Sequence, residues 1–204
     1  MGRNFFIVFS VIFFTLLCSG CDSGPRIAPF SQDAVVLAFG DSLTYGTGAS
    51  SGQSYPEVLA SLIGRPVVNV GVPGEVSASG LTRLPAMLAR YNPSLVILCH
   101  GGNDFLRRLD PEETSRNLKA MVELIRSQGA DVILIGVPKL GFGLGVPKLY
   151  SNIAAQYAIP LQKDILLDLL SDNAMKSDAI HPNATGYRLM AEAIYEVINK
   201  AQHK

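Results

Sequence analysis

The feature that most constrains the fold is a set of short, almost continuous apolar segments that recur along the chain. Four are plain, at Val35–Phe39, Val67–Val70, Leu95–Cys99 and Val132–Val137, and a weaker fifth lies at Ile159–Gln162. Segments that are apolar at nearly every position, rather than at alternate ones, are typical of strands buried on both faces of a parallel sheet. We therefore expect a sheet of about five parallel strands.

The segments between these strands have helical patterns. Residues 111–128 are the clearest case, because Asp110 can cap the first turn, Pro111 suits the first helical position and Gly129 follows the end. Further helices are expected at 54–63, 77–90, 147–157 and 183–201. Strands that alternate with helices predict a doubly wound, three-layer α/β/α domain. One such domain, over residues 34–201, accounts for the chain after its first 33 residues.

The first 20 residues differ in character from the rest. Arg3 supplies a positive charge, and Phe5–Leu17 form an apolar core broken only by two hydroxyl residues. This core is too short for a comfortable membrane span, which needs about 20 apolar residues. We therefore expect residues 1–20 to be a secretory signal peptide.

The end of this segment resembles the lipobox of bacterial lipoproteins. Ser19 and Gly20 precede Cys21, although Cys18 stands where that pattern usually has a branched apolar residue. We expect Cys21 to be lipidated and residues 21–33 to form the lipidated N-terminus and a tether. The protein would then be an exported, membrane-anchored lipoprotein facing the periplasm or the cell exterior. The alternative is a plain cleaved signal in which Cys21 is incidental.

Charge and cysteine content narrow the possible partners. Lys plus Arg and Asp plus Glu both number 17, so no basic surplus indicates a nucleic-acid partner. Cys99 is the only cysteine that would remain unmodified, and inside an apolar strand it is expected to be a small buried hydrophobe. No disulfide framework is therefore expected. We expect a monomer.

Polar residues directly follow the predicted strands. Ser42 comes just after the first strand, at the sheet edge where open α/β sheets bind ligands. If Ser42 is a nucleophile, it needs a general base. His181 lies in a polar loop before the last helix, and Asp178, three residues upstream, is able to accept a hydrogen bond from its imidazole. His100 is expected to be a core residue and His203 to lie in the tail.

Candidate oxyanion donors follow the second and third strands. Gly74 allows a backbone N–H to approach a ligand closely, but it also suits an ordinary turn. Asn103 carries a side-chain amide that could face developing negative charge, or could brace its own turn. Asp41 and Asp104 are expected to be caps or turn braces rather than catalytic acids.

Together these residues resemble the four blocks of the SGNH (GDSL) hydrolase family. The blocks are Gly40-Asp41-Ser42-Leu43, Gly74, Gly101-Gly102-Asn103-Asp104 and Asp178-Ala179-Ile180-His181. The residues in and around these blocks are similar to those of the bacterial branch of the family that includes acyl-CoA thioesterase I, lysophospholipase L1 and arylesterase. The resemblance implies a flavodoxin-like fold, no cofactor and no metal.

The resemblance also implies the role of each site residue. Ser42 would be the nucleophile, His181 the base and Asp178 the carboxylate that orients it. The N–H groups of Ser42 and Gly74, with the Asn103 side chain, would form the oxyanion hole. The implied function is a serine esterase that hydrolyses aryl esters, lysophospholipids or acyl thioesters through an acyl-enzyme.

Two loops are candidates for the acyl-binding wall. Residues 105–109 (Phe-Leu-Arg-Arg-Leu) follow the third strand, and residues 138–145, which include Phe142 and Leu144, follow the fourth. Arg107, Arg108 or Lys139 could lie near a phosphate or coenzyme A. The alternative is that these are ordinary solvated loops.

Three other functions are compatible with parts of the sequence. A carbohydrate or peptidoglycan O-acetyl esterase would use the same catalytic residues, so only tests with different substrates distinguish it from the implied esterase. A flavodoxin-type module could bind phosphate with the hydroxyl-rich loop after the first strand, but it needs neither Asn103 nor His181. A catalytically inactive lipoprotein scaffold is disfavoured because every expected functional position is filled.

Overall fold

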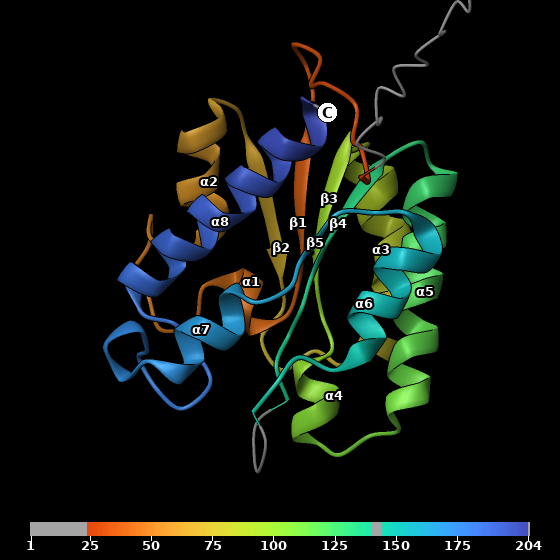
Figure 1. The fold of residues 1–204 in the computed structure, drawn as a ribbon. Helices are drawn as coiled ribbons and strands as arrows, with labels where there is room; N and C mark the ends of the chain where they lie inside the picture. Colours follow the sequence, from red (N-terminus) through yellow and green to blue (C-terminus); the bar gives the residue numbers. More distant parts are fainter. Residues whose placement is uncertain (1–23, 140–143, 204) are drawn as a thin grey trace, which may run out of the picture.

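The structure is a computed structural model that describes residues 24–139 and 144–203. Within those residues it contains one sheet of five parallel strands in the order β2-β1-β3-β4-β5 (Figure 1). The strands are β1 (Val36–Gly40), β2 (Val67–Gly71), β3 (Leu95–Cys99), β4 (Asp131–Ile135) and β5 (Leu161–Gln162). The predicted parallel sheet is therefore confirmed, with β3 at its predicted bounds and the others close to theirs.

Burial follows the position of each strand in the sheet. Every residue of β1 and of β3 is buried, as expected for central strands covered on both faces. The edge strand β2 is only partly buried, and its Asn69 is exposed. Cys99, at the end of β3, is fully buried and free, which confirms that it packs as a small hydrophobe.

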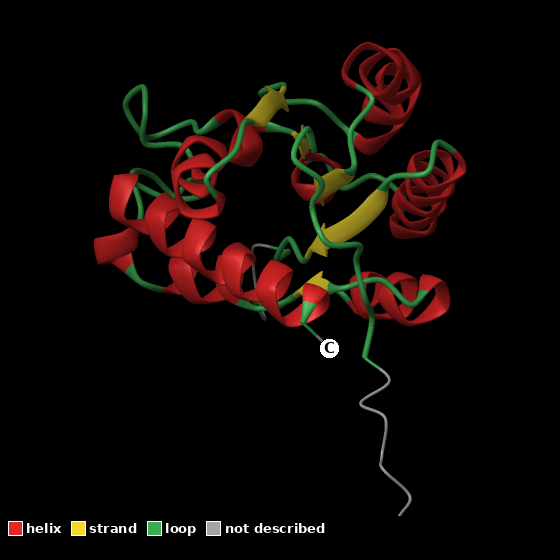
Figure 2. Ribbon diagram, turned by 90° about the horizontal axis from the view of Figure 1, so that it is seen from above, coloured by secondary structure: helices red, strands yellow, loops and turns green. Residues whose placement is uncertain are grey.

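Helices cover both faces of the sheet, so the predicted three layers are confirmed (Figures 1 and 2). The helices α2 (Tyr55–Ile63) and α8 (Ala184–Gln202) pack together on one face. The other face carries α3 (Ser77–Tyr91), α5 (Pro111–Ser127) and α6 (Lys148–Tyr157). All five lie within a residue or two of their predicted bounds.

Side-chain caps fix the starts of two helices, and the first confirms the capping prediction at Asp110. Asp110 accepts a hydrogen bond from the N–H of Glu112, and Pro111 is the first residue of α5. Asn183 caps α8 in the same way, by accepting a hydrogen bond from the N–H of Gly186. These caps fix where each helix begins, and the α8 cap lies two residues after the predicted base.

Four short elements were not predicted from the sequence. They are the helices α1 (Ser42–Tyr45), α4 (Gly102–Leu106) and α7 (Ile165–Ser171) and the 3₁₀ helix η1 (Asn173–Met175). Elements of one or two turns are too short to show a hydrophobic period. Two of them begin directly after a strand: α1 follows β1 and α4 follows β3.

The described part of the predicted tether, residues 24–33, packs against the domain, so the prediction needs correction there. Ile27 is buried in the core, and its N–H donates to the carbonyl of Ala201 near the end of α8. The N–H of Ala28 donates to the Asp131 carboxylate at the start of β4. Arg65 lies over the Phe30 ring, 4.6 Å from its centroid. The Gly and Pro residues near Ile27 and Phe30 favour a tether, but both apolar side chains have partners in the domain to pack against.

This docked segment lies at the amino ends of the strands, opposite α1 and α4 (Figure 1). The predicted signal peptide and Cys21 fall outside the described residues. Among the helices that the structure describes, none is both long enough and apolar enough to span a membrane.

Candidate active site

The register of the three neighbouring strands brings their following loops together. Gly40 of β1 pairs with Gly71 of β2 on one side and with Cys99 of β3 on the other, and all three strands run in the same direction. The residues after these three positions therefore emerge side by side at the carboxyl edge of the sheet, where ligands of open α/β sheets bind.

Ser42 begins α1, directly after β1. The Asp41 side chain caps this helix by accepting a hydrogen bond from the N–H of Leu43 at 3.0 Å, as expected for a cap. Gly40 must lack a side chain here, because a Cβ would collide with the Cys99 carbonyl and the Thr44 hydroxyl. The sharp passage from strand to helix thus depends on Gly40 and Asp41.

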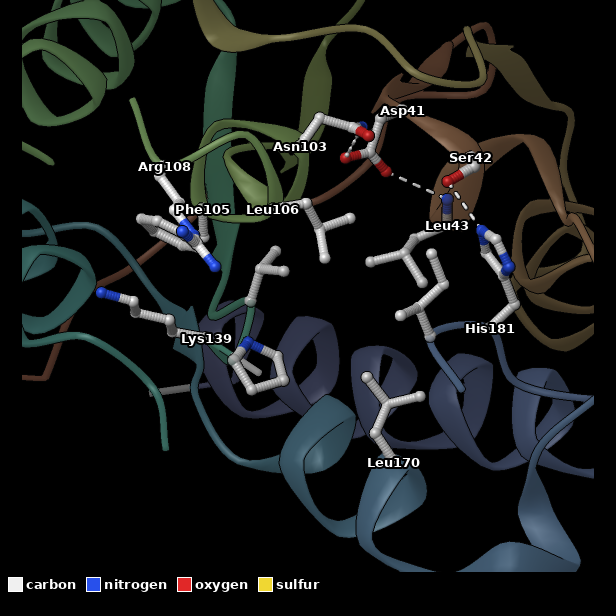
Figure 3. Close-up of a pocket in the computed structure, with 14 residues that line it drawn as sticks. Asp41, Ser42, Leu43, Asn103, Phe105, Leu106, Arg108, Lys139, Leu170 and His181 are labelled. Carbon is white, nitrogen blue, oxygen red and sulfur yellow. Dashed lines mark hydrogen bonds between the residues drawn. The ribbon is translucent and has the colours of Figure 1, made fainter. Parts of the chain in front are cut away.

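Ser42, His181 and Asp178 form a continuous hydrogen-bonded chain (Figure 3). His181 Nε2 lies 3.0 Å from Ser42 Oγ, and His181 Nδ1 lies 2.7 Å from Asp178 Oδ2. Because a carboxylate only accepts, Nδ1 carries the ring proton and Nε2 is left free to accept the serine proton. The three side chains predicted as nucleophile, base and orienting carboxylate are therefore brought together.

Asp178 is held by more than the imidazole. Its Oδ1 accepts hydrogen bonds from the N–H groups of Ile180 and His181, at 2.8 and 2.9 Å. Burial opposes ionisation, but the bonds from His181 and from these N–H groups outweigh it and lower the pKa of Asp178. Asp178 therefore remains a carboxylate and keeps the imidazole in one orientation.

The loop that carries Asp178 and His181 is tied to the loop after α1. The N–H of Ser177 donates to the carbonyl of His181, which closes the loop on itself. Tyr187 of α8 donates its hydroxyl hydrogen to the Thr47 carbonyl at 2.8 Å. Gly48, with φ of 96°, lets the two loops meet, because a Cβ there would collide with Ser177. These contacts hold His181 against Ser42.

Asn103 lies beside Asp41 and is oriented by two acceptors. Its Nδ2 donates to Asp41 Oδ2 at 3.1 Å and to the Glu75 carbonyl at 3.0 Å. The Asp41 carboxylate and the Glu75 carbonyl can only accept hydrogen bonds, so the NH₂ group of the Asn103 amide must face them. Burial raises the pKa of Asp41, although His100, the Leu43 N–H, His181 and Asn103 oppose this shift.

The other predicted residues occupy distinct places. Gly74 adopts φ of 77°, and its carbonyl accepts a hydrogen bond from Arg107 at 2.8 Å. Gly74 therefore has the expected turn conformation. It precedes Glu75, whose carbonyl accepts a hydrogen bond from Asn103. Asp104 is buried and accepts from the N–H and hydroxyl of Ser77, which confirms that it is a brace.

A cavity of about 430 Å³ opens beside Ser42 and His181 (Figure 3). In the segment predicted as a loop after β3, Phe105 and Leu106 instead lie on α4, and Arg108 lies in the turn that follows; all three line the cavity. The loop after β4 contributes Pro138 and Lys139. The full lining is Asp41, Ser42, Leu43, Gly102, Asn103, Phe105, Leu106, Arg108, Val137, Pro138, Lys139, Leu170, Ile180 and His181. Both segments were correctly predicted to border the site.

Some details of the cavity differ from the sequence-based expectation. Arg107 does not line the cavity but donates a hydrogen bond to the Gly74 carbonyl. Leu144 does not line the cavity either, and Phe142 lies outside the described residues. Leu170 was missed because it lies on α7, one of the elements that showed no recognisable period. Two of the lining residues carry positive charge, and Figure 3 shows them across the cavity from Ser42 and His181.

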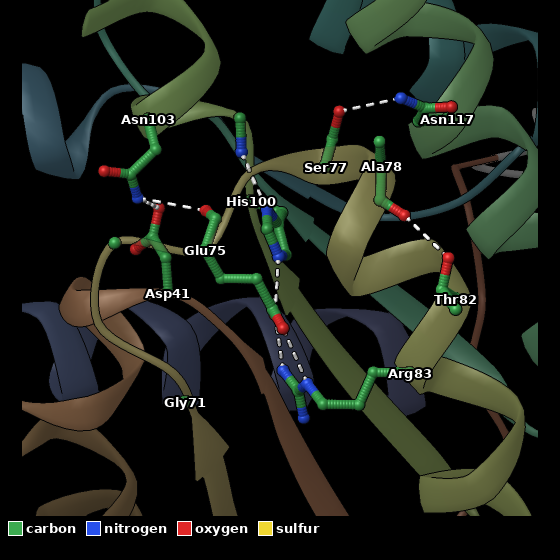
Figure 4. A network of polar contacts seen from close by, with 12 residues as sticks. Asp41, Gly71, Glu75, Ser77, Ala78, Thr82, Arg83, His100, Asn103 and Asn117 are labelled. Carbon is green, nitrogen blue, oxygen red and sulfur yellow. Dashed lines mark hydrogen bonds and ion pairs between the residues drawn. The ribbon is translucent and has the colours of Figure 1, made fainter. Parts of the chain in front are cut away.

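A buried polar cluster that sequence reasoning missed lies behind Asn103 (Figure 4). Arg83 donates two hydrogen bonds to the Glu75 carboxylate, at 2.8 and 2.7 Å, and His100 Nε2 lies 3.1 Å from the same carboxylate. His100 is fully buried, which confirms its expected place in the core. Burial opposes ionisation of Glu75, but Arg83 and His100 outweigh it and lower its pKa to about 2.

This fold and this group of side chains define a serine hydrolase. A serine at the start of a helix, a histidine in contact with it and a carboxylate behind the histidine are the parts that acyl transfer needs. Residues 38–189 match the GDSL-like Lipase/Acylhydrolase family, and the chain belongs to that family.

Individual relatives agree with this assignment. Esterase TesA of Pseudomonas aeruginosa is 30% identical over 194 residues, which cover 90% of this chain and 96% of the relative. The Thioesterase 1/protease 1/lysophospholipase L1 of Escherichia coli K12 is 29% identical over 166 residues, 77% of this chain and 79% of the relative. The crystal structure of TesA matches with a TM-score of 0.75 and 30% identity, over 82% of this chain and 99% of that one. The protein is an ester hydrolase of the GDSL type.

The lowered pKa of Glu75 predicts a specific dependence of stability on acid. Its folded pKa of about 2 lies below the ordinary value of 4.5, so its contribution is complete above about pH 4.5 and is lost as pH falls toward 2. That contribution is about 3 kcal/mol. Between pH 6 and pH 3, urea unfolding should therefore show a larger loss of stability for the unmodified protein than for Glu75→Gln.

A surface variant provides the control for this measurement. Glu192→Gln removes the exposed ion pair with Arg188 on α8 and should follow the unmodified protein. If Glu75→Gln lost as much stability in acid as the unmodified protein, Glu75 would not be the group that titrates.

Proposed function

We propose that the protein hydrolyses esters or thioesters of apolar acyl chains, with Ser42 as nucleophile, His181 as base and Asp178 as the orienting carboxylate. The single observation that carries this proposal is the hydrogen-bonded chain from Ser42 Oγ to Asp178, with separations of 3.0 and 2.7 Å, at the edge of a largely apolar cavity. No residue needs to move before Ser42 can transfer its proton.

The reaction proceeds in two halves. Ser42 Oγ attacks the carbonyl carbon while His181 Nε2 takes its proton, and a tetrahedral oxyanion forms. The imidazolium, stabilised by the Asp178 carboxylate, then protonates the departing alcohol or thiol as the carbon–oxygen or carbon–sulfur bond breaks. Water, deprotonated by His181, attacks the acyl-enzyme and releases the acid and Ser42.

We assign the oxyanion to the N–H groups of Ser42 and Gly74 and to the amide of Asn103. Ser42 N–H lies at the start of α1, where backbone donors are not used by the helix. In the resting site both hydrogens of the Asn103 amide are engaged, by Asp41 and by Glu75. Asn103 would therefore share one of these hydrogens with the oxyanion as charge develops.

The lining of the cavity supports an apolar acyl chain. Seven side chains next to or across from Ser42 are apolar: Leu43, Phe105, Leu106, Val137, Pro138, Leu170 and Ile180. Arg108 and Lys139 add positive charge, which favours a substrate with an anionic group such as the phosphate of a lysophospholipid or an acyl-coenzyme A. The E. coli relative is named for thioesterase and lysophospholipase activities.

The O-acetyl esterase alternative has less support. A cavity of about 430 Å³ lined by these side chains is larger and more apolar than an acetyl group needs. The relatives reported above are named as an esterase and as a thioesterase, and neither name refers to a carbohydrate.

The acyl-wall proposal predicts a loss that depends on chain length. Leu106→Ser removes an exposed apolar side chain from the cavity, so it should lower kcat/KM for p-nitrophenyl octanoate by about fivefold to tenfold. The value for p-nitrophenyl acetate should stay within about twofold, because the short acyl group does not reach this wall.

Leu109→Ser is the matched control, since Leu109 is similarly exposed, lies three residues further on, beyond the end of α4, and does not line the cavity. This variant should leave kcat/KM for both esters unchanged, and Ser42→Ala should abolish hydrolysis of both. Equal losses on the two esters in Leu106→Ser would remove the acyl-wall assignment. Activity retained in Ser42→Ala would remove the mechanism.

We further propose that the protein is exported, anchored through a lipid on Cys21 and active as a monomer. Ser19-Gly20-Cys21 after an apolar core supports the first two points. Cys21 precedes the docked Ile27 by six residues, a reach of roughly 20 Å. An anchored domain would therefore keep the amino edge of its sheet near the membrane and point Ser42 away from it. Light scattering of the purified domain tests the last point, and a mass of one chain is expected.

Anchoring predicts that Cys21→Ser releases the protein from membranes. In a bacterial host fed an alkyne-labelled fatty acid, the unmodified protein should be labelled and found in the membrane fraction. Cys21→Ser should be unlabelled and soluble, and Cys99→Ser serves as the control, because Cys99 is buried in β3. A Cys21→Ser protein that stayed labelled would show that the lipid is elsewhere or that the signal is of another kind.

A further inference from the structure

Glu75 has an unusual position in this site, because its backbone and its side chain hold different parts of the molecule. Its carbonyl accepts a hydrogen bond from the Asn103 amide at 3.0 Å. The residue before it is Gly74, whose carbonyl is held by Arg107. The loop that carries Glu75 therefore touches both outer donors of the proposed oxyanion hole.

The Glu75 carboxylate is fixed from two sides. Arg83 of α3 donates two parallel hydrogen bonds to this carboxylate, a geometry that fixes direction as well as distance. Arg83 is itself stacked over the Phe39 ring of β1, 4.3 Å from the centroid. The carboxylate is 8% exposed, so solvent screens this pair weakly.

His100 completes the cluster in a defined protonation state. The N–H of Gly101 donates to His100 Nδ1 at 3.2 Å, so Nδ1 must carry a lone pair. The ring proton is therefore on Nε2, which donates to Glu75 at 3.1 Å. Gly80 of α3 makes room for the ring, because a Cβ there would press on His100 Nε2.

From this geometry we propose that Glu75, Arg83 and His100 act as a positioning triad, which fixes the direction of the Gly74 N–H and of the Asn103 amide. The inference rests on the proposed function, because it presupposes that these two groups receive the oxyanion. Figure 4 shows the connection, with Glu75 between Asn103 on one side and Arg83 and His100 on the other. None of the three touches the reacting atoms.

The physical reason for such a triad is preorganisation. Donors that already point to where charge develops need no rearrangement during the reaction, and a displacement of about 1 Å can cost about a hundredfold in rate. A flexible loop around Gly74 would not hold that accuracy alone. The buried cluster ties this loop to α3 and to the end of β3, which are rigid elements.

Glu75→Gln tests the proposal, because it keeps the shape of the side chain and removes one acceptor. Both oxygens of the Glu75 carboxylate accept hydrogen bonds from Arg83 and His100. A glutamine side chain has only one acceptor oxygen, and its NH₂ group would face one of these donors. We expect kcat for p-nitrophenyl octanoate to fall about tenfold, with KM within about twofold. The inhibition constant of an alkyl trifluoromethyl ketone, which forms an anionic tetrahedral adduct with serine, should rise by a similar factor.

A pair of His100 variants separates positioning from simple stability. His100→Gln retains an N–H donor that can reach Glu75, and His100→Leu retains none. The glutamine variant should keep more of the original kcat and inhibitor affinity than the leucine variant. Ile125→Val in the core of α5 is the control for lowered stability, and it should lower the unfolding temperature without changing kcat or the inhibition constant.

The outcomes distinguish this inference from the proposed function. If Ser42→Ala is inactive but Glu75→Gln keeps its kcat and inhibition constant within twofold, the positioning role is wrong and the mechanism stands. If kcat and inhibitor affinity in the Glu75 and His100 variants fall only as they do in Ile125→Val, the cluster is structural and the inference is overturned. If Ser42→Ala is active, both proposals are overturned together.

Discussion

The alignment of three parallel strand ends is the constraint on which the rest of this site depends. Gly40, Gly71 and Cys99 share one level across β2, β1 and β3. Ser42, the Gly74 loop and the Asn103 turn therefore start from neighbouring points on a buried sheet. Glycine at Gly40 and at Gly71 lets α1 fold back tightly over this edge, because a Cβ at either position would collide with backbone. A shift of one residue in any of these strands would separate the three loops.

Buried acceptors then set the direction of the polar groups on that edge. Asp178 holds the tautomer of His181, and Asp41 and the Glu75 carbonyl hold the amide of Asn103. Each acceptor is in turn fixed by backbone N–H groups or by a neighbouring cation. The catalytic chain and the oxyanion side are thus built on the same principle, in which an oriented carboxylate or carbonyl determines where a donor points. Apolar side chains line much of the cavity beside them.

The sequence was informative where a pattern is long or a motif is local. The continuous apolar segments predicted the sheet, and the cap at Asp110 predicted the start of α5, because both signals depend on neighbouring residues. His181 and Asp178 are three residues apart, so their pairing could be inferred. The contact of Glu75 with His100 joins residues on different elements, and nothing in either neighbourhood indicates it. Ile27 was assigned to a tether because Gly and Pro residues surround it, although burial against α8 outweighs that local signal.

The proposed mechanism depends first on Ser42 being the nucleophile that receives the acyl group. The most direct measurement is to treat the purified protein with an alkyl fluorophosphonate and locate the adduct by peptide mass spectrometry. The proposed mechanism requires stoichiometric modification of the peptide that contains Ser42, with activity lost in proportion, and much slower modification when His181 is replaced by alanine. An adduct on another residue, or full activity after Ser42 is modified, would contradict it.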